Sequence, residues 1–201
     1  MVHDRLGPPS GSRVIVVGGC GGIGRSYVEG LLAADCRVAV MDLPASLQAA
    51  PVPEGVMAVA ADASREGEMQ AAFEQVVTRF GGLDVLAHVA GINPRQARVE
   101  DIDFADYERV MQVNLRSAVL AGQLALPAMK AGGGAMVFVS SGLAANPEPT
   151  FGAYSISKAG IVALAKTSRP ASSRRSRWVA WPPPATLRDP CCSSPVRPRP
   201  T

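Results

Sequence analysis

The sequence predicts an α/β protein built on a doubly wound parallel sheet, and three observations predict it. Short apolar runs alternate with helical patterns along the chain. Each run is nearly continuous in apolar residues, which is typical of strands that are buried on both faces. A glycine-rich loop joins the first run to the first helical pattern. Such sheets bind ligands outside the carboxyl ends of their strands, so we expect the functional residues at that edge.

The elements follow one another in a regular order. Strands are predicted at Arg13–Val17, Arg37–Met41, Val56–Ala60, Leu83–Val89 and Ala135–Ser140. Helices are predicted at Gly24–Ala34, Glu66–Phe80, Ala105–Lys130 and Tyr154–Lys166, from apolar residues at helical spacing. Crossovers between parallel strands are right-handed almost without exception, so helices are expected on both faces of the sheet.

The regular pattern stops near Thr167. Residues 168–201 contain eight prolines, seven arginines and six serines, with Trp178, Val179 and Trp181 as the only strand-like residues. This composition buries too little apolar surface to offset the entropy of ordering, so the segment is predicted to be a disordered tail. The chain is therefore divided into a folded domain, residues 10–167, and a tail, residues 168–201.

Composition excludes several classes of protein. No apolar run reaches the ~18 residues of a membrane helix, and the charged first ten residues do not form a secretory signal. We therefore expect a cytoplasmic protein without a membrane partner. The cysteines do not have metal-ligand spacing with the two histidines, so neither a metal site nor a disulfide framework is expected; they are Cys20, Cys36, Cys191 and Cys192.

The charge of the chain is unevenly distributed. The net charge is +3, but the tail holds seven of the 20 basic residues and only one of the 17 acids, so residues 1–167 are mildly acidic. A nucleic-acid partner is therefore not expected for the folded domain. A protein that binds nucleic acid through its arginine tail remains a rival hypothesis. It requires salt-sensitive binding that disappears when residues 168–201 are removed.

The loop Gly18-Gly19-Cys20-Gly21-Gly22-Ile23-Gly24 is a candidate site for a dinucleotide. Gly18 would permit a tight turn, and Gly24 would let the helix pack closely on the strand. Gly22 and Ile23 would bring free N–H groups at the start of the helix to a pyrophosphate. A purely structural turn between strand and helix is the alternative.

Two aspartates end neighbouring strands. Asp42 lies 18 residues after Gly24, where a carboxylate can accept hydrogen bonds from ribose hydroxyls and would repel a 2′-phosphate. The loop also lacks Lys and Arg between Gly18 and Gly24, so NAD is favoured over NADP. Asp42 could instead merely cap the strand end. Asp62 has two equally supported interpretations, a contact with the adenine amino group or an N-cap of the next turn.

Tyr154 and Lys158 are four residues apart and share a helix face. A lysine ammonium favours the ionised form of a nearby phenol, which then exchanges protons near neutral pH. Ser141, at the end of a strand, could donate a hydrogen bond to a substrate oxygen. Asn114 lies inside a predicted helix and could hold a relay water. A surface Tyr–Lys pair and a solvent-facing asparagine are the alternatives.

Taken together, these residues resemble the short-chain dehydrogenase/reductase family. The resemblance covers about residues 10–167 and implies a Rossmann-type, three-layer α/β/α fold. Its motifs are Gly18-x-x-x-Gly22-Ile23-Gly24, Asp42, Asp62-Ala63, Ala90-Gly91, Asn114, Ser140-Ser141 and Tyr154-Ser155-Ile156-Ser157-Lys158-Ala159-Gly160.

The resemblance also implies a reaction, the transfer of a hydride between NAD(H) and a small alcohol or ketone. It implies that Tyr154 is the acid/base, that Lys158 assists it and holds the nicotinamide ribose, that Ser141 positions the substrate, and that Asn114 supports a proton relay. Tyr154 and Lys158 thus also count as cofactor-binding residues, with the glycine loop, Asp42, Asp62-Ala63 and Ala90-Gly91. Members of the family commonly form dimers or tetramers, so a homo-oligomer is possible.

The sequence departs from the family pattern at three places. Val17 stands where the family has threonine, and His88-Val89 stand where it has two asparagines; His88 is interpreted as a structural replacement. The last strands of the family are not recognisable after Thr167. We hypothesise that residues 168–201 arise from a shifted reading frame or a truncated gene, a divergent natural tail being the alternative. An inactive remnant that binds nucleotide weakly or not at all is the rival to an active enzyme. The substrate cannot be read from the sequence.

Overall fold

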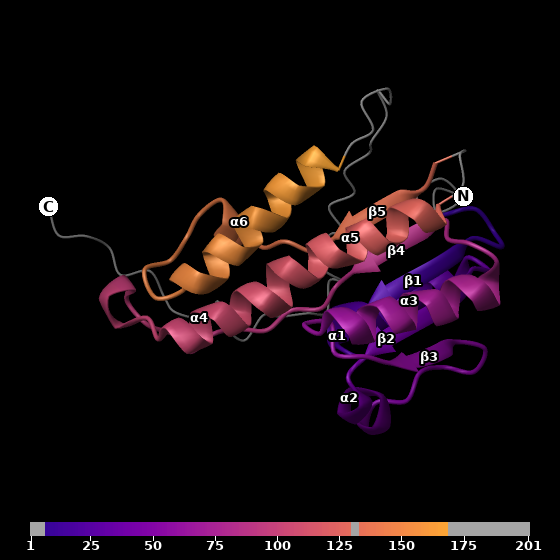
Figure 1. Cartoon of the computed structure of the whole chain (residues 1–201), viewed down its shortest axis with the longest axis horizontal. Coiled ribbons are helices and arrows are strands. Elements are labelled where there is room, and N and C mark those ends of the chain that lie inside the picture. The colour runs from indigo at the N-terminus through magenta and orange to yellow at the C-terminus, as the bar shows by residue number, and fades with distance from the viewer. Residues whose placement is uncertain (1–6, 130–132, 169–201) are drawn as a thin grey trace, which may run out of the picture. The chain divides into compact units, whose positions relative to one another are not determined.

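The computed structural model of this chain describes residues 7–129 and 133–168 and contains a parallel five-stranded sheet in the order β3-β2-β1-β4-β5 (Figure 1). The strands are β1 (Arg13–Val17), β2 (Arg37–Asp42), β3 (Met57–Ala60), β4 (Val85–His88) and β5 (Ala135–Phe138). Val17 at the end of β1 pairs with Met41 on one side and His88 on the other. The carboxyl ends of the three central strands therefore lie level with one another.

The principal helices are α1 (Gly22–Ala33), α2 (Pro44–Ala49), α3 (Glu66–Phe80), α4 (Phe104–Met111), α5 (Ser117–Ala128) and α6 (Gly152–Thr167). Two short 3-10 turns, η2 (Val99–Asp101) and η4 (Gly142–Ala144), lie in the loops before α4 and α6. The sequence pattern did not predict α2, since this six-residue helix buries none of its residues and so has no apolar face. Only Pro44, at its first position, marks its start.

Alternate residues of β1 face two separate hydrophobic clusters. Val14 and Val16 pack toward Val28 and Leu31 of α1. Ile15 and Val17 face the opposite cluster, to which α3 and α5 contribute Met69, Phe73, Val76, Leu120, Ala121 and Ala125. Each fully buried Val, Leu, Ile, Met or Phe side chain contributes about 1.5 to 3 kcal/mol of transfer free energy. The sheet is thus covered on both faces, which confirms the doubly wound, three-layer fold.

The predicted helix Ala105–Lys130 is divided by a π-turn, η3 (Gln112–Arg116), into α4 and α5. A π-turn holds one residue more than an α-helical turn, and such turns are frequent at functional sites. The Asp103 carboxylate caps the start of α4, where its Oδ1 accepts a hydrogen bond of 2.8 Å from the Ala105 N–H. At the other end, α5 stops at Ala128, and helix α6 packs against α4 and the π-turn.

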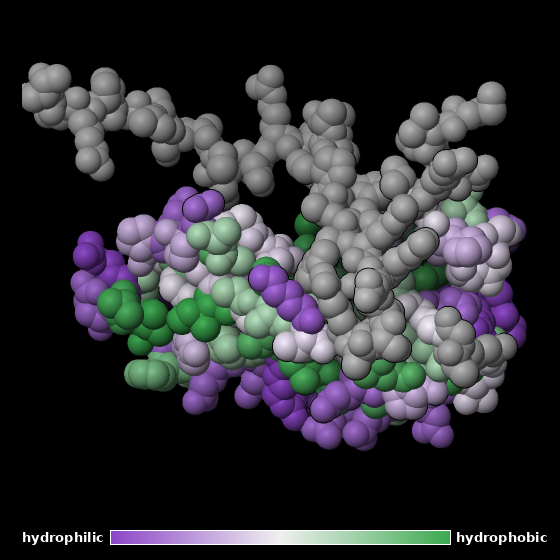
Figure 2. All heavy atoms as spheres, turned by 90° about the horizontal axis from the view of Figure 1, so that it is seen from above, coloured by the Kyte–Doolittle hydropathy of each residue, from purple (hydrophilic) through white to green (hydrophobic). Residues whose placement is uncertain are grey.

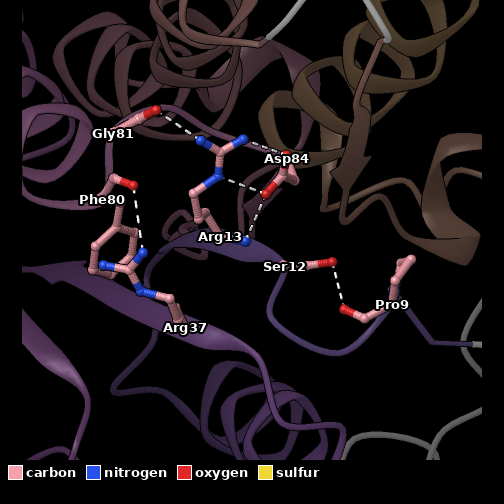
Figure 3. Close-up of polar contacts among 7 residues, drawn as sticks. All are labelled: Pro9, Ser12, Arg13, Arg37, Phe80, Gly81 and Asp84. Carbon is pink, nitrogen blue, oxygen red and sulfur yellow. Dashed lines mark hydrogen bonds and ion pairs between the residues drawn. The ribbon is translucent and has the colours of Figure 1, made fainter.

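An arginine clamp around Arg13 and Asp84 fastens the amino ends of β1 and β4 (Figure 3). The glycine loop follows the carboxyl end of β1 and so lies at the opposite end of the sheet. The backbone N–H and Nε of Arg13 both donate to Asp84 Oδ2, at 2.9 and 2.7 Å. A third donor, Nη1, reaches the Gly81 carbonyl at 2.7 Å. Beside this clamp the guanidinium of Arg37 lies 4.7 Å from the centre of the Phe80 ring. The clamp joins two strands that are about 70 residues apart in the sequence.

Strand β5 lies at one edge of the sheet. Its residues are half-buried or exposed, whereas all four residues of β4 are buried. Among residues 7–129 and 133–168, no strand pairs with the outer side of β5. The predictions for residues 168–201, a disordered tail and a shifted reading frame, lie outside the described residues, apart from Ser168.

Some hydrophobic side chains of the described residues remain at the surface, among hydrophilic ones (Figure 2). The most exposed are Val99 and Phe104, at 80% and 77%, in the loop before α4 and at its start. No helix in the described part of the chain combines the length and apolarity needed to cross a bilayer. The same residues contain no group of three or more His, Cys, Asp or Glu side chains that could hold a metal ion.

Candidate active site

The glycine loop follows β1 and turns sharply into α1. Gly18 has φ of +85°, and a Cβ at this residue would lie 2.5 Å from the backbone nitrogen of Ala90. A Cβ at Gly24 would lie 2.2 Å from the Gly18 carbonyl oxygen. Both positions therefore require glycine, the first for the left-handed turn and the close approach of the loop after β4, the second for helix packing.

The start of α1 presents backbone N–H groups that no side chain caps. Gly21 is the N-cap residue without a side-chain hydrogen bond, and the first turn contains no acidic residue. The space around a Cβ at Gly22 is open to at least 4 Å, and Ile23 is 55% exposed. Uncapped N–H groups and the helix dipole favour an anion, so this helix start fits a phosphate group.

Asp42 ends β2 and fastens the glycine loop. Its Oδ2 accepts a hydrogen bond from the Cys20 N–H at 2.9 Å, and its Oδ1 accepts one from Leu43 N–H at 2.8 Å. A carboxylate accepts about four hydrogen bonds, so each oxygen can still receive a hydroxyl. The same carboxylate and burial raise the pKa of the Cys20 thiol to about 11, burial being the larger cause.

Asp62 and Ala63 follow β3 and lie in a local turn. Asp62 Oδ1 accepts hydrogen bonds from the N–H and the hydroxyl of Ser64, at 2.9 and 2.7 Å. This arrangement is an Asx turn that precedes α3. The Asp62 backbone N–H donates to Glu68 at 2.8 Å, and Ala63 packs against the core. The cap-like geometry is therefore present, and a contact of Asp62 with adenine remains a prediction.

Two consecutive residues, Ala90 and Gly91, connect the glycine loop to the catalytic candidates. Ala90 donates its N–H to the Val17 carbonyl at 2.9 Å and lies against Gly18. A Cβ at the next residue, Gly91, would lie 3.2 Å from Lys158 Nζ and 3.3 Å from Asn114 Oδ1. The structure thus brings residues from β1, β4, the π-turn and α6 to one place at the carboxyl edge of the sheet.

Tyr154 and Lys158 lie one turn apart on α6. The Lys158 ammonium lies 5.6 Å from the centre of the Tyr154 ring and donates to the Val139 carbonyl at 3.0 Å. Lys158 is only 4% exposed, and burial lowers its pKa from 10.5 to about 8. In the described part of the chain, no carboxylate forms an ion pair with it. At pH 7 the protonated form predominates, with two N–H groups beyond the one that Val139 accepts.

Asn114 is completely buried and joins three elements. Its Oδ1 accepts from the Ile92 N–H at 2.7 Å, and its Nδ2 donates to the Ile92 carbonyl at 3.0 Å. The second proton of Nδ2 goes to Ser157 Oγ at 3.1 Å, and Ser157 donates to the Tyr154 carbonyl at 2.7 Å. Both donors of Asn114 are therefore used, and only a lone pair on Oδ1 is left for the relay water that the sequence predicted.

The two serines after β5 have different contacts. Ser140 donates from Oγ to the backbone carbonyl of Lys158 at 2.8 Å and so ties the end of β5 to α6. Ser141 Oγ accepts from the Leu143 N–H at 3.2 Å, which caps the turn η4. Turn η4 packs against α6. The Ser141 hydroxyl proton is not used in this cap, so it can be donated to a substrate oxygen.

Several residues that support the site were not predicted as such. The Val139 carbonyl, which accepts from Lys158, is a backbone group and leaves no signal in the sequence. Ser157 stands inside the Tyr154-x-x-x-Lys158 motif, so its place on the inner face of α6 could have been found from helical spacing. His88 and Ser117 are buried together, with Nε2 and Oγ 2.8 Å apart.

Comparison with known proteins identifies one family. Residues 12–177 match the short chain dehydrogenase family. An uncharacterized short-chain type dehydrogenase/reductase of Sinorhizobium fredii is 33% identical over 83% of this chain and 30% of its own length. The 4-formylbenzenesulfonate dehydrogenase of Comamonas testosteroni is 31% identical, over 76% of this chain and 63% of its own length. This chain thus spans less than two thirds of the length of these relatives.

The solved structures give the same similarity. The 3-ketoacyl-(acyl-carrier-protein) reductase of Brucella melitensis, complexed with NADH, is 25% identical and superposes with a TM-score of 0.74. That match covers 79% of this chain and 68% of the reductase. A short-chain type dehydrogenase/reductase of Mycobacterium ulcerans gives the same TM-score, with 80% of this chain and 62% of that chain covered.

Proposed function

Since this chain belongs to the short-chain dehydrogenase family, we propose that it transfers a hydride between NAD(H) and an alcohol or carbonyl substrate, with Tyr154 as the acid/base. One observation carries the proposal. Ala90 lies against Gly18 of the glycine loop, and its neighbour Gly91 lies against Lys158 Nζ and Asn114 Oδ1. A cofactor whose pyrophosphate is held at the start of α1 would therefore have its other end near the tyrosine and the lysine.

The residues of the glycine loop fit a dinucleotide. The uncapped N–H groups of α1 and the open space at Gly22 suit a pyrophosphate, as argued above. Asp42 supports NAD rather than NADP, because its carboxylate can accept the ribose hydroxyls and would repel a 2′-phosphate. The NADH complex of the Brucella reductase supports a nicotinamide cofactor in this chain. A small alcohol or ketone is proposed as the substrate.

A bound nicotinamide supplies hydride acceptance or donation at carbon. The residues of this chain move the accompanying proton. In alcohol oxidation the Tyr154 oxygen takes the hydroxyl proton, and in carbonyl reduction it returns a proton to the carbonyl oxygen. The Lys158 ammonium lies beside the Tyr154 ring and can bind a ribose hydroxyl with its remaining N–H groups. Ser141 donates to the substrate oxygen, and Asn114 anchors α6 by its bond to Ser157.

The test uses the full chain and separates binding from turnover. Calorimetric titration with NAD and NADP should give a measurable dissociation constant for NAD and a weaker one for NADP. A panel of alcohols and ketones is then screened for NADH formation or consumption. Tyr154→Phe should lower kcat by at least about 100-fold and leave NADH binding unchanged. Tyr107→Phe, which removes a hydroxyl from α4, is the matched control and should retain wild-type turnover.

The alternative is an inactive remnant of the family that binds nucleotide weakly or not at all. The half-exposed edge strand β5, which has no strand on its outer side among residues 7–129 and 133–168, favours it. The absence of both NAD binding and turnover in a folded protein would support the remnant and contradict the proposal. Cofactor binding without turnover across the panel would support nucleotide binding alone.

A further inference from the structure

The buried pair of His88 and Ser117 joins β4 to the start of α5, directly after the π-turn, and its hydrogen bonds are assigned from the contacts of Ser117 and the neutrality of the ring. Ser117 Oγ contacts both His88 Nε2, at 2.8 Å, and the Val113 carbonyl oxygen. A carbonyl oxygen only accepts hydrogen bonds, so the single hydroxyl proton of Ser117 goes to Val113. The bond with His88 then requires a proton on Nε2. A neutral imidazole carries one N–H, so in neutral His88 this proton is on Nε2 and Nδ1 is unprotonated.

The surroundings of the ring keep it neutral. His88 is 2% exposed, and burial lowers its pKa to about 3, with the nearby Lys158 ammonium as the second cause. The Phe138 ring on β5 lies 6.4 Å from it, centre to centre. A second proton on the imidazole would be buried near a positive charge, which is unfavourable. The ring therefore acts as a fixed donor to Ser117 across the neutral pH range.

The hydrogen bond from His88 goes to Ser117, which directly follows the π-turn that contains Asn114. Val113 also lies in the π-turn, and the hydroxyl of Ser117 bonds back to the Val113 carbonyl four residues earlier. Such back-bonding bends helices. Asn114 lies between them and holds both Ile92, after β4, and Ser157, on α6. One series of hydrogen bonds thus runs from His88 on β4 through Ser117 to Val113. A second runs from Ile92, after β4, to Asn114, so both reach the π-turn.

We propose that His88 is a positioning residue: its Nε2–H, through Ser117, fixes the π-turn and thereby holds Asn114 between the exit of β4 and α6. The tautomer and the hold on the turn do not depend on the activity of the chain. The consequence for turnover rests on the proposed function. The sequence assigned His88 only a structural role, and the two hydrogen bonds of Ser117 now connect it to the site.

The first test is the tautomer, measured by long-range ¹H–¹⁵N NMR of the ring in the ¹⁵N-labelled full chain. The chain contains only two histidines, so His3→Gln leaves His88 as the single imidazole signal. We expect the protonated-type nitrogen shift on Nε2 and the unprotonated type on Nδ1, unchanged from pH 6 to pH 8. A proton on Nδ1, or titration of the ring within that range, would overturn the proposal.

The second test is amide hydrogen exchange of residues 112–118. Ser117→Ala removes two hydrogen bonds of the buried hydroxyl and His88→Leu removes one, so each should speed exchange there at least about tenfold. His88→Gln can place an amide N–H near the position of Nε2 and should stay within about threefold of wild type. Ser12→Ala removes another buried serine hydroxyl, at the amino end of β1, and is the control. Equal acceleration in this control, or none in Ser117→Ala, would contradict the proposal.

The third test applies to turnover and separates the two proposals. If the chain oxidises an alcohol, His88→Leu should lower kcat about tenfold with the KM for NAD unchanged, and His88→Gln should restore most of the loss. A change in the KM for NAD with kcat unchanged would contradict the positioning role. If the wild type shows no turnover, the proposed function fails, while the tautomer and exchange results still decide the inference about His88.

Discussion

At the scale of one residue, burial of the Lys158 ammonium in the candidate site lowers the stability of the fold. The ammonium is buried and donates to the carbonyl of Val139, the residue after β5, and burial lowers its pKa to about 8. A buried, unpaired cation is held at the expense of folding free energy. Natural chains retain such groups where function needs them, and the acid/base role proposed for Tyr154 would supply that reason here.

Replacing Lys158 by methionine should therefore stabilise the fold. Below about pH 8 both the folded and the unfolded wild type carry the proton, so the folded state bears the full cost of burial. We expect Lys158→Met to raise the free energy of unfolding at pH 7 by about 1 to 3 kcal/mol. Between about pH 8 and 10.5 the folded wild type releases its proton before the unfolded chain does, so its stability rises and the difference closes.

Urea unfolding of the two proteins from pH 6 to pH 10 measures this difference. Lys166→Met, at the last turn of α6, is the matched control, and its difference from wild type should stay small and nearly constant over the range. A Lys158→Met protein that is less stable than wild type at pH 7 would show that the hydrogen bond to Val139 outweighs the burial of the charge.

The candidate site could be predicted from the sequence where side chains carry the chemistry. Tyr154 and Lys158 follow from helical spacing, and Asp42 from its place at the end of a strand. The partners of Asn114 could not be predicted, because they are the backbone of Ile92 and a serine 43 residues away. Contacts of that kind depend on how helices cross the sheet, which a single sequence does not encode locally.

At the scale of the elements, the glycine loop contains two glycines that differ in the space available for a side chain. A methyl group at Gly24 would collide with the Gly18 carbonyl and with Gly19 Cα, at 2.2 and 2.8 Å, and both are backbone atoms that cannot turn away. A methyl group at Gly22 would meet no protein atom within 4 Å. Substitutions at the two positions therefore test the packing of α1 separately from the anion binding proposed at its start.

We expect Gly24→Ala to lower the free energy of unfolding by about 2 kcal/mol or more through overpacking. Gly22→Ala should change it by less than about 1 kcal/mol, since alanine is the better helix former. The same variant should nevertheless weaken NADH binding at least about tenfold, because its methyl group would take the space of the pyrophosphate. Thermal unfolding and calorimetric titration of both variants check this, and equal NADH affinity in Gly22→Ala and wild type would contradict the assigned place of the anion.

The sequence pattern failed to predict two elements, because neither is marked by a change in the periodic spacing of apolar residues. Helix α2 buries none of its residues, so nothing in its sequence repeats with the helix. The π-turn lies within a continuous apolar helical pattern, and an extra residue there changes the hydrogen bonds without interrupting the pattern. Strands β1, β2 and β4 were predictable because they are buried on both faces and read as continuous apolar runs.

At the scale of the whole molecule, the Arg13 clamp and the candidate site lie at opposite ends of the same strands. Arg13→Met should lower the free energy of unfolding by about 1 to 3 kcal/mol, because it removes a partly buried bidentate ion pair and a bond to Gly81. NADH affinity should stay within about twofold of wild type, since the clamp lies at the amino end of β1 and the glycine loop follows its carboxyl end.

Arg37→Met is the comparison for this prediction. Its guanidinium lies over the Phe80 ring and makes only long hydrogen bonds, at 3.4 and 3.5 Å. The expected loss is less than about 1 kcal/mol. Chemical unfolding of both variants, with NADH titrated at a temperature where both are folded, gives the two quantities. A loss of NADH affinity in Arg13→Met larger than in Arg37→Met would mean that the two ends of the sheet are coupled.

The sequence was enough to predict a parallel, doubly wound sheet, whereas the partial burial of its edge strand β5 could not be predicted. Alternating strands and helices indicate parallel pairing with crossovers, but the half-buried state of β5 depends on what lies beside it in space. An apolar edge strand with unpaired backbone groups is a site for association of chains. Within the described residues, this edge is where the molecule departs most from the even burial of β1 and β4.

The π-turn also determines how this chain would tolerate losing a residue. An α-helix advances by about 100° per residue, so deleting one residue elsewhere between Phe104 and Ala128 would rotate one half of the helix away from the sheet. At the π-turn the surplus residue can be deleted, and the ladder can close as an ordinary α-helix with both halves in their present orientation. Excising Asn114 would thus be a deletion that the scaffold absorbs, while the tie from β4 to α6 disappears with it.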